Sequence, residues 1–219
     1  SMVAQKRQVV DGYPIANFAL TVNASVSGDF FGQIMQNPGT LGDWLTNRGA
    51  VMFSIEKDGR RQLFSEFPKK NIIREFPFVK NDYKGSSLTK VTFTTEAFCP
   101  LEVNDAETSA LPVLMLEICC SNPTSKEEHF TLVAQPDENL AKDMSFCEND
   151  EYTGISNKNN CQITTDQTES LWAGQKLSIP VSLLAGEKKK IKVLFTFRDD
   201  NWISSINFRT LDDLSAYAY

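Results

Sequence analysis

The stretch that decides the fold runs from Ser87 to Ala134 and reads SLTKVTFTTEAFCPLEVNDAETSALPVLMLEICCSNPTSKEEHFTLVA. Apolar and polar residues alternate along residues 88–98 and again along residues 128–134, as in β-strands with one buried face. Between them, residues 111–120 are apolar on both faces apart from Glu117, so we expect this strand to be buried on both sides. The stretch therefore predicts three β-strands joined by two polar turns.

Strand patterns and turn residues continue through most of the remaining chain. The Asp58-Gly59 pair between residues 50–56 and 61–67 predicts a hairpin, and the turn at residues 185–187 predicts a second hairpin between the strands on either side of it. Further expected features are strands at residues 15–27, 71–79, 160–165, 177–184 and 190–197, strand edges or bends at Pro77 and Pro180, and a flexible surface loop at residues 149–160. With roughly ten to thirteen strands, the chain is expected to be all-β, a large two-sheet antiparallel β-sandwich.

The pattern changes near the end of the chain. Residues 208–219 have a helical period, and Thr210 with Asp213 three positions later resembles a capping box. No stop signal follows, so we expect a linker helix that continues past a domain boundary. The predicted organisation is a lead-in at residues 1–14, a β-sandwich domain at 15–205, and at 206–219 the start of a linker helix to a further domain that is missing from this sequence.

Charge argues against two classes of partner. The 219 residues carry a formal net charge of −6, and a uniformly acidic surface repels a nucleic-acid backbone or an anionic membrane. The basic clusters Lys69–Lys70 and Lys188–Lys190 are short and are interpreted as solvated turns. We therefore predict no nucleic-acid partner.

No stretch of the sequence is apolar for long enough to form a transmembrane helix, and residues 1–12 lack the apolar centre of a signal peptide. The predicted location is therefore the cytoplasm. Ser1 before Met2 resembles the remnant of a removed expression tag, so the prediction becomes secreted or periplasmic if a leader was trimmed away with it.

The five cysteines and the single histidine do not form a metal-binding pattern. No two cysteines have the CxxC spacing, so we predict neither a metal nor another cofactor. Cys119 and Cys120 point to opposite faces of one strand and are interpreted as packing residues. Cys147 and Cys161 flank a polar loop and can form a disulfide in an oxidising compartment, but the composition favours the reduced state. The sequence leaves both alternatives open.

Two acidic residues, Asp105 and Glu107, invite a comparison with paired catalytic carboxylates. They are two positions apart in a polar loop, and no apolar pocket is evident that would raise the pKa of one of them. A solvated loop is the preferred interpretation, and no catalytic residue is predicted in this chain.

Residues 28–49 form a different kind of loop, with five glycines, one proline and one tryptophan. The glycines and the proline indicate turns, while the large apolar residues must pack against something. The loop either closes one end of the sandwich or faces a partner domain or ligand. In the second case the candidate domain-interface or ligand-facing residues are Phe30, Phe31, Asp43, Trp44, Asn47, Arg48 and, from further along the chain, Trp202.

Several short motifs resemble the N-terminal domain of the bile-acid β-glucosidase or non-lysosomal glucosylceramidase family. Within the deciding stretch these are EAFCP at residues 96–100, SALPV at 109–113 and NPTSK at 122–126. LGDW at 41–44 with NRG at 47–49, AGE at 185–187 and the terminal helix extend the resemblance over most of the chain. Two segments depart from the family pattern: residues 22–28 hold a single glycine, and Arg198-Asp199-Asp200 replaces an aromatic and proline run. A divergent member or a neighbouring family fits these departures.

The resemblance implies a galactose-mutarotase-like β-supersandwich followed by an (α/α)6 catalytic domain. In that family a nucleophile Glu and an acid/base Asp in the helical domain hydrolyse a glycosidic bond with retention. Related sugar phosphorylases and glucoamylase-like enzymes also place a large β-sandwich before a helical barrel. None of the family's catalytic positions maps onto this chain, so the resemblance implies an accessory domain, inactive alone, whose partner is the helical domain and whose full enzyme acts on a carbohydrate or glycolipid.

Two alternatives remain. The chain can be an independent carbohydrate-binding module that stacks sugars on Trp44, Trp172 and Trp202, although buried or interface aromatics are commoner. It can also be a purely structural sandwich. The sugar, the linkage and the oligomeric state are not indicated by the sequence.

Overall fold

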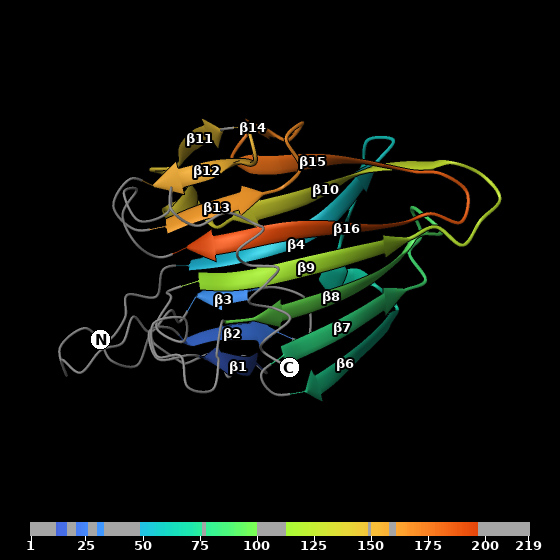
Figure 1. Ribbon diagram of the computed structural model, residues 1–219, viewed down its shortest axis with the longest axis horizontal. Helices are drawn as coiled ribbons and strands as arrows, with labels where there is room; N and C mark the ends of the chain where they lie inside the picture. Colours follow the sequence, from blue (N-terminus) through green and yellow to red (C-terminus); the bar gives the residue numbers. More distant parts are fainter. Residues whose placement is uncertain are drawn as a thin grey trace.

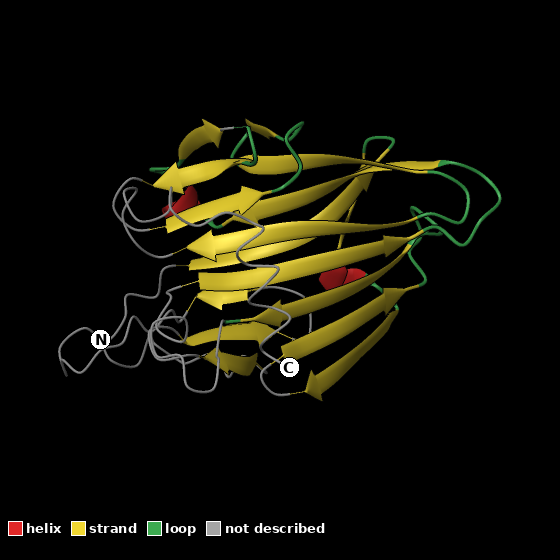
Figure 2. Ribbon diagram, in the orientation of Figure 1, coloured by secondary structure: helices red, strands yellow, loops and turns green. Residues whose placement is uncertain are grey.

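The chain is a two-sheet antiparallel β-sandwich in the computed structural model (Figure 1; Figure 2), which confirms the predicted fold class. The structure describes residues 12–16, 21–25, 30–32, 49–75, 78–99, 113–148, 150–157 and 161–196. The predicted lead-in and the predicted linker helix at 206–219 lie outside these ranges, so the domain boundaries stay predictions.

The first sheet has eight strands, in the order β1-β2-β3-β4-β10-β15-β14, with β5 paired to β4. Its strands are β1 (Gly12–Ala16), β2 (Thr21–Ser25), β3 (Phe30–Gly32), β4 (Gly49–Lys57), β5 (Arg60–Leu63), β10 (Glu128–Pro136), β14 (Leu171–Ala173) and β15 (Lys176–Leu183). A 3-10 turn, η1 (Phe64–Glu66), follows β5, and a short helix, α2 (Glu138–Ala141), follows β10.

The second sheet also has eight strands, in the order β11-β12-β13-β16-β9-β8-β7-β6. Its strands are β6 (Lys69–Glu75), β7 (Phe78–Lys84), β8 (Thr92–Phe98), β9 (Val113–Ser121), β11 (Ser145–Glu148), β12 (Thr153–Asn157), β13 (Cys161–Thr165) and β16 (Lys188–Thr196). Both sheets therefore contain strands from the first and the second half of the chain.

The two halves meet along one strand pair in each sheet. Strands β1 to β9 occupy one side of both sheets and strands β10 to β16 the other, as the colours of Figure 1 show. The halves join where β10 pairs with β4 in the first sheet and where β16 pairs with β9 in the second. Neither sheet is complete without both halves.

The deciding stretch folds into strands as its pattern predicts. Phe93 and Ala97 of β8 face the core, and residues 113–116 of β9 are all at most 1% exposed. The side chains of Met115 and its cross-strand partners Phe98 and Leu194 lie on the face opposite the core cluster and are also buried. The prediction that this strand is buried on both sides is thus confirmed.

An aromatic cluster fills one part of the core beneath η1. Phe64 and Phe67 stack with ring centroids 5.1 Å apart, and both meet Tyr83 and Phe93 edge to face. Phe93 in turn meets Phe130 of the other sheet. The strand predicted over 61–67 therefore ends at Leu63, because a 3-10 turn lets both Phe64 and Phe67 point inward, which strict alternation would not allow.

Three other sequence expectations need correction. Residues 71–79, expected as one strand, contain the end of β6 and the start of β7, which pair as a hairpin. Residues 149–160, expected as a flexible loop, contain β12, whose polar composition hides its pairing with β13. The hairpin expected around residues 185–187 does not form, because β15 lies in the first sheet and β16 in the second.

Candidate functional site

The two loops that carry the chain from one sheet to the other lie together at one end of the sandwich. Residues 122–127 connect β9 to β10, and residues 184–187 connect β15 to β16. Figure 1 shows both loops projecting beyond the other strand ends. We call residues 122–127 and 184–190 the loop tip, since Lys188, Lys189 and Lys190 open β16 directly after the second loop. The tip combines a network of polar contacts between distant segments with exposed charged and apolar side chains, which makes it the candidate site.

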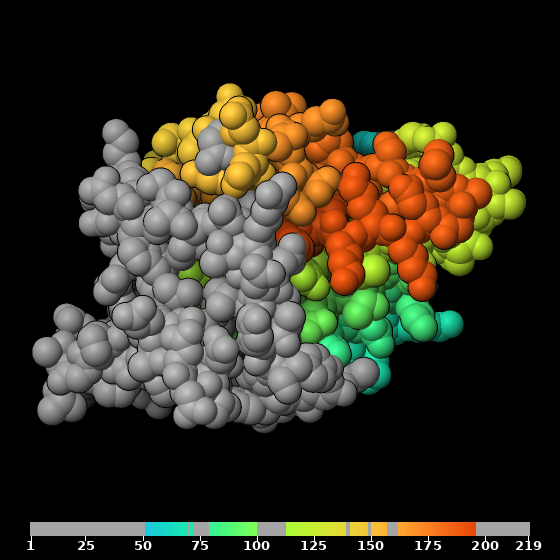
Figure 3. Space-filling model, viewed as in Figure 1, coloured from blue at the N-terminus to red at the C-terminus, as the bar shows by residue number. Residues whose placement is uncertain are grey.

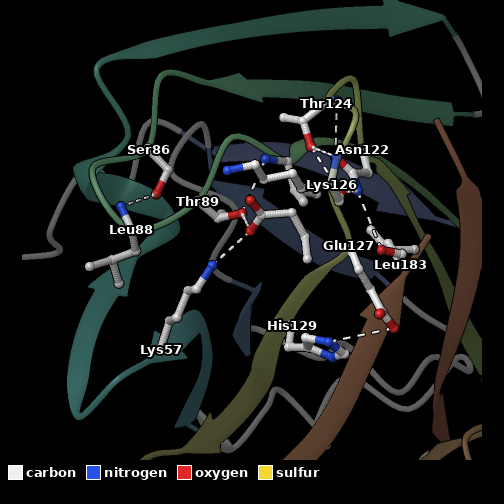
Figure 4. A network of polar contacts seen from close by, with 12 residues as sticks. Lys57, Ser86, Leu88, Thr89, Asn122, Thr124, Lys126, Glu127, His129 and Leu183 are labelled. Atoms are coloured by element: carbon white, nitrogen blue, oxygen red, sulfur yellow. Dashed lines mark hydrogen bonds and ion pairs between the residues drawn. The ribbon is translucent and has the colours of Figure 1, made fainter. Parts of the chain in front are cut away.

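Asn122 holds the loop tip together from within (Figure 4). Asn122 is only 1% exposed. Its side-chain Nδ2 donates to the carbonyl oxygens of Lys126 (2.7 Å), Leu184 (3.0 Å) and Leu183 (3.3 Å). Its Oδ1 accepts from the backbone N–H and the hydroxyl of Thr124, at 3.0 and 2.8 Å. One amide thus satisfies polar groups of both loops, and a buried polar group left without such a partner is costly.

The backbone completes this connection. The N–H of Asn122 donates to the carbonyl oxygen of Glu187 at 2.9 Å, and the N–H of Glu187 donates to that of Leu184 at 3.0 Å. The Glu187 carboxylate accepts from the N–H of Leu184 at 3.2 Å. Gly186 has a positive φ of 73°, which suits this tight turn because glycine lacks a Cβ. The second loop therefore has a fixed conformation.

Beside the tip, Glu128 forms a half-buried ion pair at the start of β10. Its Oε2 lies 2.7 Å from Nζ of Lys57 and accepts from the hydroxyl of Thr89 at 3.0 Å. The hydrogen bond from Lys57 is the main cause that lowers the pKa of this carboxyl, with a smaller contribution from Thr89. A general acid at neutral pH needs a raised pKa, so Glu128 is suited to hold β4, β10 and the loop after β7 together rather than to transfer protons.

The single histidine is close to this pair but exposed. His129 Nδ1 lies 2.8 Å from the hydroxyl of Ser182 on β15, and its Nε2 is 3.5 Å from the carboxylate of Glu127. Among the described residues, no group of three His, Cys, Asp or Glu side chains is placed to hold a metal ion. The histidine is therefore a surface residue of the sheet.

Another polar cluster lies on β4, β5, β10 and β15. Arg61 donates through Nε to the hydroxyl of Ser54 at 3.2 Å and through Nη2 to Oε1 of Gln135 at 2.6 Å. Lys176 pairs with Glu56 at 3.1 Å. Arg61 thereby gives the hydroxyl of the fully buried Ser54 a hydrogen-bond partner.

The predicted interface residues fall mostly outside the described ranges. Asp43, Trp44, Asn47, Arg48 and Trp202 are not among the described residues. Phe30 and Phe31 lie in β3, paired by backbone between β2 and β4. Asp105 and Glu107 are outside the described ranges as well. The proposed interface of the loop at residues 28–49 thus stays a prediction.

Trp172, the third tryptophan considered as a sugar platform, is half-buried in β14 and packs against the hydrophobic core. It pairs with Leu177, which is fully buried, so both side chains lie on the inner face of the sheet. The structure therefore favours a role for Trp172 in the core over a role as a sugar-stacking platform.

Four of the cysteines, Cys99, Cys119, Cys120 and Cys147, form no disulfide bond. Burial raises the pKa of the Cys99 thiol, and burial followed by the adjacent Cys119 raises that of Cys120 to about 12. On β12, Gly154 pairs with Cys147 of β11, and Asn157 pairs with Cys161 of β13. The two cysteines are therefore on opposite sides of β12 and three residues apart along it. That separation exceeds the roughly 7 Å that a disulfide can span between Cα atoms, so the two do not bridge.

Comparisons with known proteins identify the fold but not a family. No family model and no curated protein matches the sequence. The structure is similar to a protein from the human microbiome assigned as a kojibiose phosphorylase, with a TM-score of 0.54 and 10% sequence identity over 95% of this chain. This chain spans about a third (34%) of the length of that protein. Slr1438 protein from Synechocystis sp. PCC 6803 is similar with a TM-score of 0.47 and 9% identity, over 86% of this chain and 96% of that one.

The sequence motif NPTSK resembles a family pattern, but the resemblance does not predict that its asparagine joins the two loops. Asn followed by Thr two positions later is a known signal for a side-chain-to-backbone turn. The partners from residues 183 and 184 are about sixty positions away and carry no local signal.

Proposed function

We propose that this chain is the accessory β-sandwich domain of a sugar-active enzyme of the β-glucosidase or glucosylceramidase-like glycoside hydrolase type. An (α/α)6 catalytic domain of the same polypeptide would carry the nucleophile and the acid/base, and the whole enzyme would act on a carbohydrate or glycolipid. The observation that carries the proposal is the similarity in fold to about a third of a protein assigned as a kojibiose phosphorylase. The glucosidase-like motifs of the sequence support the narrower assignment.

The polar residues of the described chain are consistent with an accessory role. Asn122 and Glu128, the two best connected polar side chains of the candidate site, bond to loops and strands of the fold. Four cysteines without a disulfide bond suit a reducing compartment, and we place the enzyme in the cytoplasm. Among the described residues, no helix is both long and apolar enough to cross a membrane.

The test compares this chain with the product of the complete open reading frame. The 219-residue chain is expected to show no hydrolysis of aryl glucosides and no phosphorolysis of glucosyl disaccharides, while the complete product shows one of the two. Hydrolysis by the complete product would identify a hydrolase, and phosphorolysis would identify a phosphorylase. Robust turnover by the 219-residue chain would overturn the proposal.

An independent carbohydrate-binding module is the second candidate. Calorimetry with soluble glucans, using the Trp44→Ala and Trp172→Ala variants, separates it from the first. Loss of glucan binding in Trp44→Ala but not in Trp172→Ala would favour the module and place the sugar on the loop at residues 28–49. An open reading frame that ends near residue 219 would instead favour a structural protein.

A further inference from the structure

We propose that the loop tip is a docking surface for an anionic lipid bilayer, with Leu184 entering the interface and the surrounding lysines contacting the lipid headgroups. This inference rests on the described residues of the tip and not on the proposed enzymatic function. Whether the chain belongs to a glycosidase does not change its test.

The first observation is an exposed leucine on a fixed loop. Leu184 is 63% exposed, and Figure 3 shows the loops of the tip standing out from the body of the molecule. Its backbone carbonyl accepts from Asn122 and Glu187, and its backbone N–H donates to the Glu187 carboxylate. Because the polar backbone groups of Leu184 are satisfied within the loop, this residue can enter an apolar environment without leaving them unpaired.

The second observation is the charge around that leucine. Lys126, Lys188 and Lys190 are exposed and Lys189 is half-buried, and side chains at 188, 189 and 190 alternate between the faces of β16. The tip contains two acidic residues besides these four lysines. Glu127 is near His129, and the carboxylate of Glu187 accepts a hydrogen bond from the backbone. Glu128 is neutralised by Lys57. The tip is therefore locally positive.

The net charge of −6 does not prevent this contact. At physiological ionic strength the Debye length is about 8 Å, so a surface feels mainly the charges that approach it closely. The exposed acidic residues Glu148, Asp150, Glu151 and Glu169 lie in and beside β11 and β14, at the far edge of the two sheets from the strands of the first half. The expectation that an acidic chain avoids anionic membranes assumed a uniform surface, and the fold makes the surface non-uniform.

A bilayer fits these observations better than a nucleic acid does. Surfaces that bind single-stranded nucleic acids usually add aromatic side chains that stack on bases, and neither loop of the tip contains an aromatic residue. An exposed leucine surrounded by lysines is instead the combination of apolar and electrostatic signals that gives reversible membrane adsorption. Each lysine near an anionic surface contributes roughly a fivefold gain in affinity.

The test is co-sedimentation of the 219-residue chain with sucrose-loaded vesicles. Vesicles of phosphatidylcholine with about a third phosphatidylserine should bind the chain, and pure phosphatidylcholine vesicles should not; raising the salt to about 0.5 M should release it. Leu184→Ser is expected to lower the affinity about tenfold, and Lys188→Gln with Lys190→Gln about tenfold to thirtyfold. Circular dichroism melting confirms that each variant is folded.

The matched controls are outside the loop tip, at the edge of the sandwich that β11 and β14 form. Leu171, which is 65% exposed beside acidic residues, is changed to Ser, and exposed Lys142 is changed to Gln; both variants should bind like the unmodified chain. Absence of binding to the anionic vesicles would overturn the proposal. Equal losses in Leu171→Ser and Leu184→Ser, or binding to an oligonucleotide or an acidic peptide but not to vesicles, would overturn it as well.

Discussion

Two leucines with nearly equal exposure, Leu184 at 63% and Leu171 at 65%, occupy opposite surroundings in this sandwich. Leu184 lies in the loop tip, where a buried asparagine fixes the backbone and lysines predominate. Leu171 lies in the three-residue edge strand β14, close to β11 and β12 and their acidic turn. Exposure alone therefore does not distinguish a docking residue from an ordinary edge residue, whereas backbone satisfaction and local charge do.

The two regions are also stabilised differently. The tip depends on side-chain hydrogen bonds that reach between distant segments, and the edge formed by β11 to β14 depends on the close approach of neighbouring backbones. Substitutions that remove one kind of interaction should leave the other region intact, so each of the following predictions can contradict this contrast.

The largest effect is expected for Asn122→Ala. The change leaves the buried carbonyl groups of both loops without their donor, and we expect a loss of about 3 kcal/mol in the free energy of unfolding. Asn122→Asp should cost at least as much, because a carboxylate oxygen would then face three carbonyl oxygens. Urea unfolding followed by tryptophan fluorescence measures both. The exposed Ser125→Ala variant is the control, and a stability of Asn122→Asp equal to the unmodified chain would contradict the assigned role.

Gly154→Ala tests the edge in the same way. A Cβ at this position would lie 2.2 Å from the carbonyl oxygen of Ile163 and 2.7 Å from Cα of Thr164, so β12 and β13 must separate. We expect a loss of about 2–3 kcal/mol, measured by thermal unfolding. Gly174→Ala is the comparison, since its Cβ meets nothing within 4 Å and only the positive φ of 57° costs about 1 kcal/mol. Equal stability of Gly154→Ala and the unmodified chain would show that the strands are not so close.

Glu128→Gln tests the ion pair that supports the tip. Since folding lowers the pKa of this carboxyl, its stabilising effect is complete above the unfolded value of about 4.3 and is lost as the pH falls through the lower folded value. The variant should lose about 1–3 kcal/mol at neutral pH. Its stability should also fall less steeply than that of the unmodified chain as the pH drops below about 4. Glu127→Gln, in a side chain 51% exposed, serves as control, and parallel pH profiles of Glu128→Gln and the unmodified chain would disprove the assignment.

The smallest effect concerns the thiols and does not alter stability. Cys119 near the tip and Cys147 at the edge are both half-exposed, so iodoacetamide should modify them first. Cys99 and Cys120 should stay unmodified at pH 8 in the native protein, because burial raises the pKa of both thiols. Peptide mapping by mass spectrometry gives the order of modification. Early modification of Cys120 would show that the core opens on the side of β9.

The alternation of apolar residues predicted the strands because a sheet with one buried face imposes a period of two. The apolar residues of three such patterns, for example Phe93, Leu132 and Val193, do lie in the core. The same argument could not assign strands to sheets. A short turn such as residues 185–187 has the same kind of sequence whether the next strand lies in the same sheet or in the other one.

The polar strand β12 was missed for a related reason. It contains a single large apolar residue, Ile155, which is fully buried, so no alternating apolar signal appears. The loop tip could not be predicted because it joins residues about sixty positions apart. The net charge of the sequence likewise does not indicate that the fold places lysines and carboxylates in different regions of the surface.

The division of both sheets between the halves of the chain has a practical consequence for fragment complementation. A cut in the loop at residues 122–127 would leave one piece with β1 to β9 and another with β10 to β16, and each piece would expose the strand that pairs with the other in both sheets. Neither piece would have a closed core, so reassembly would restore both sheets at once. The loop tip is accordingly the position at which this sandwich can be turned into a split reporter.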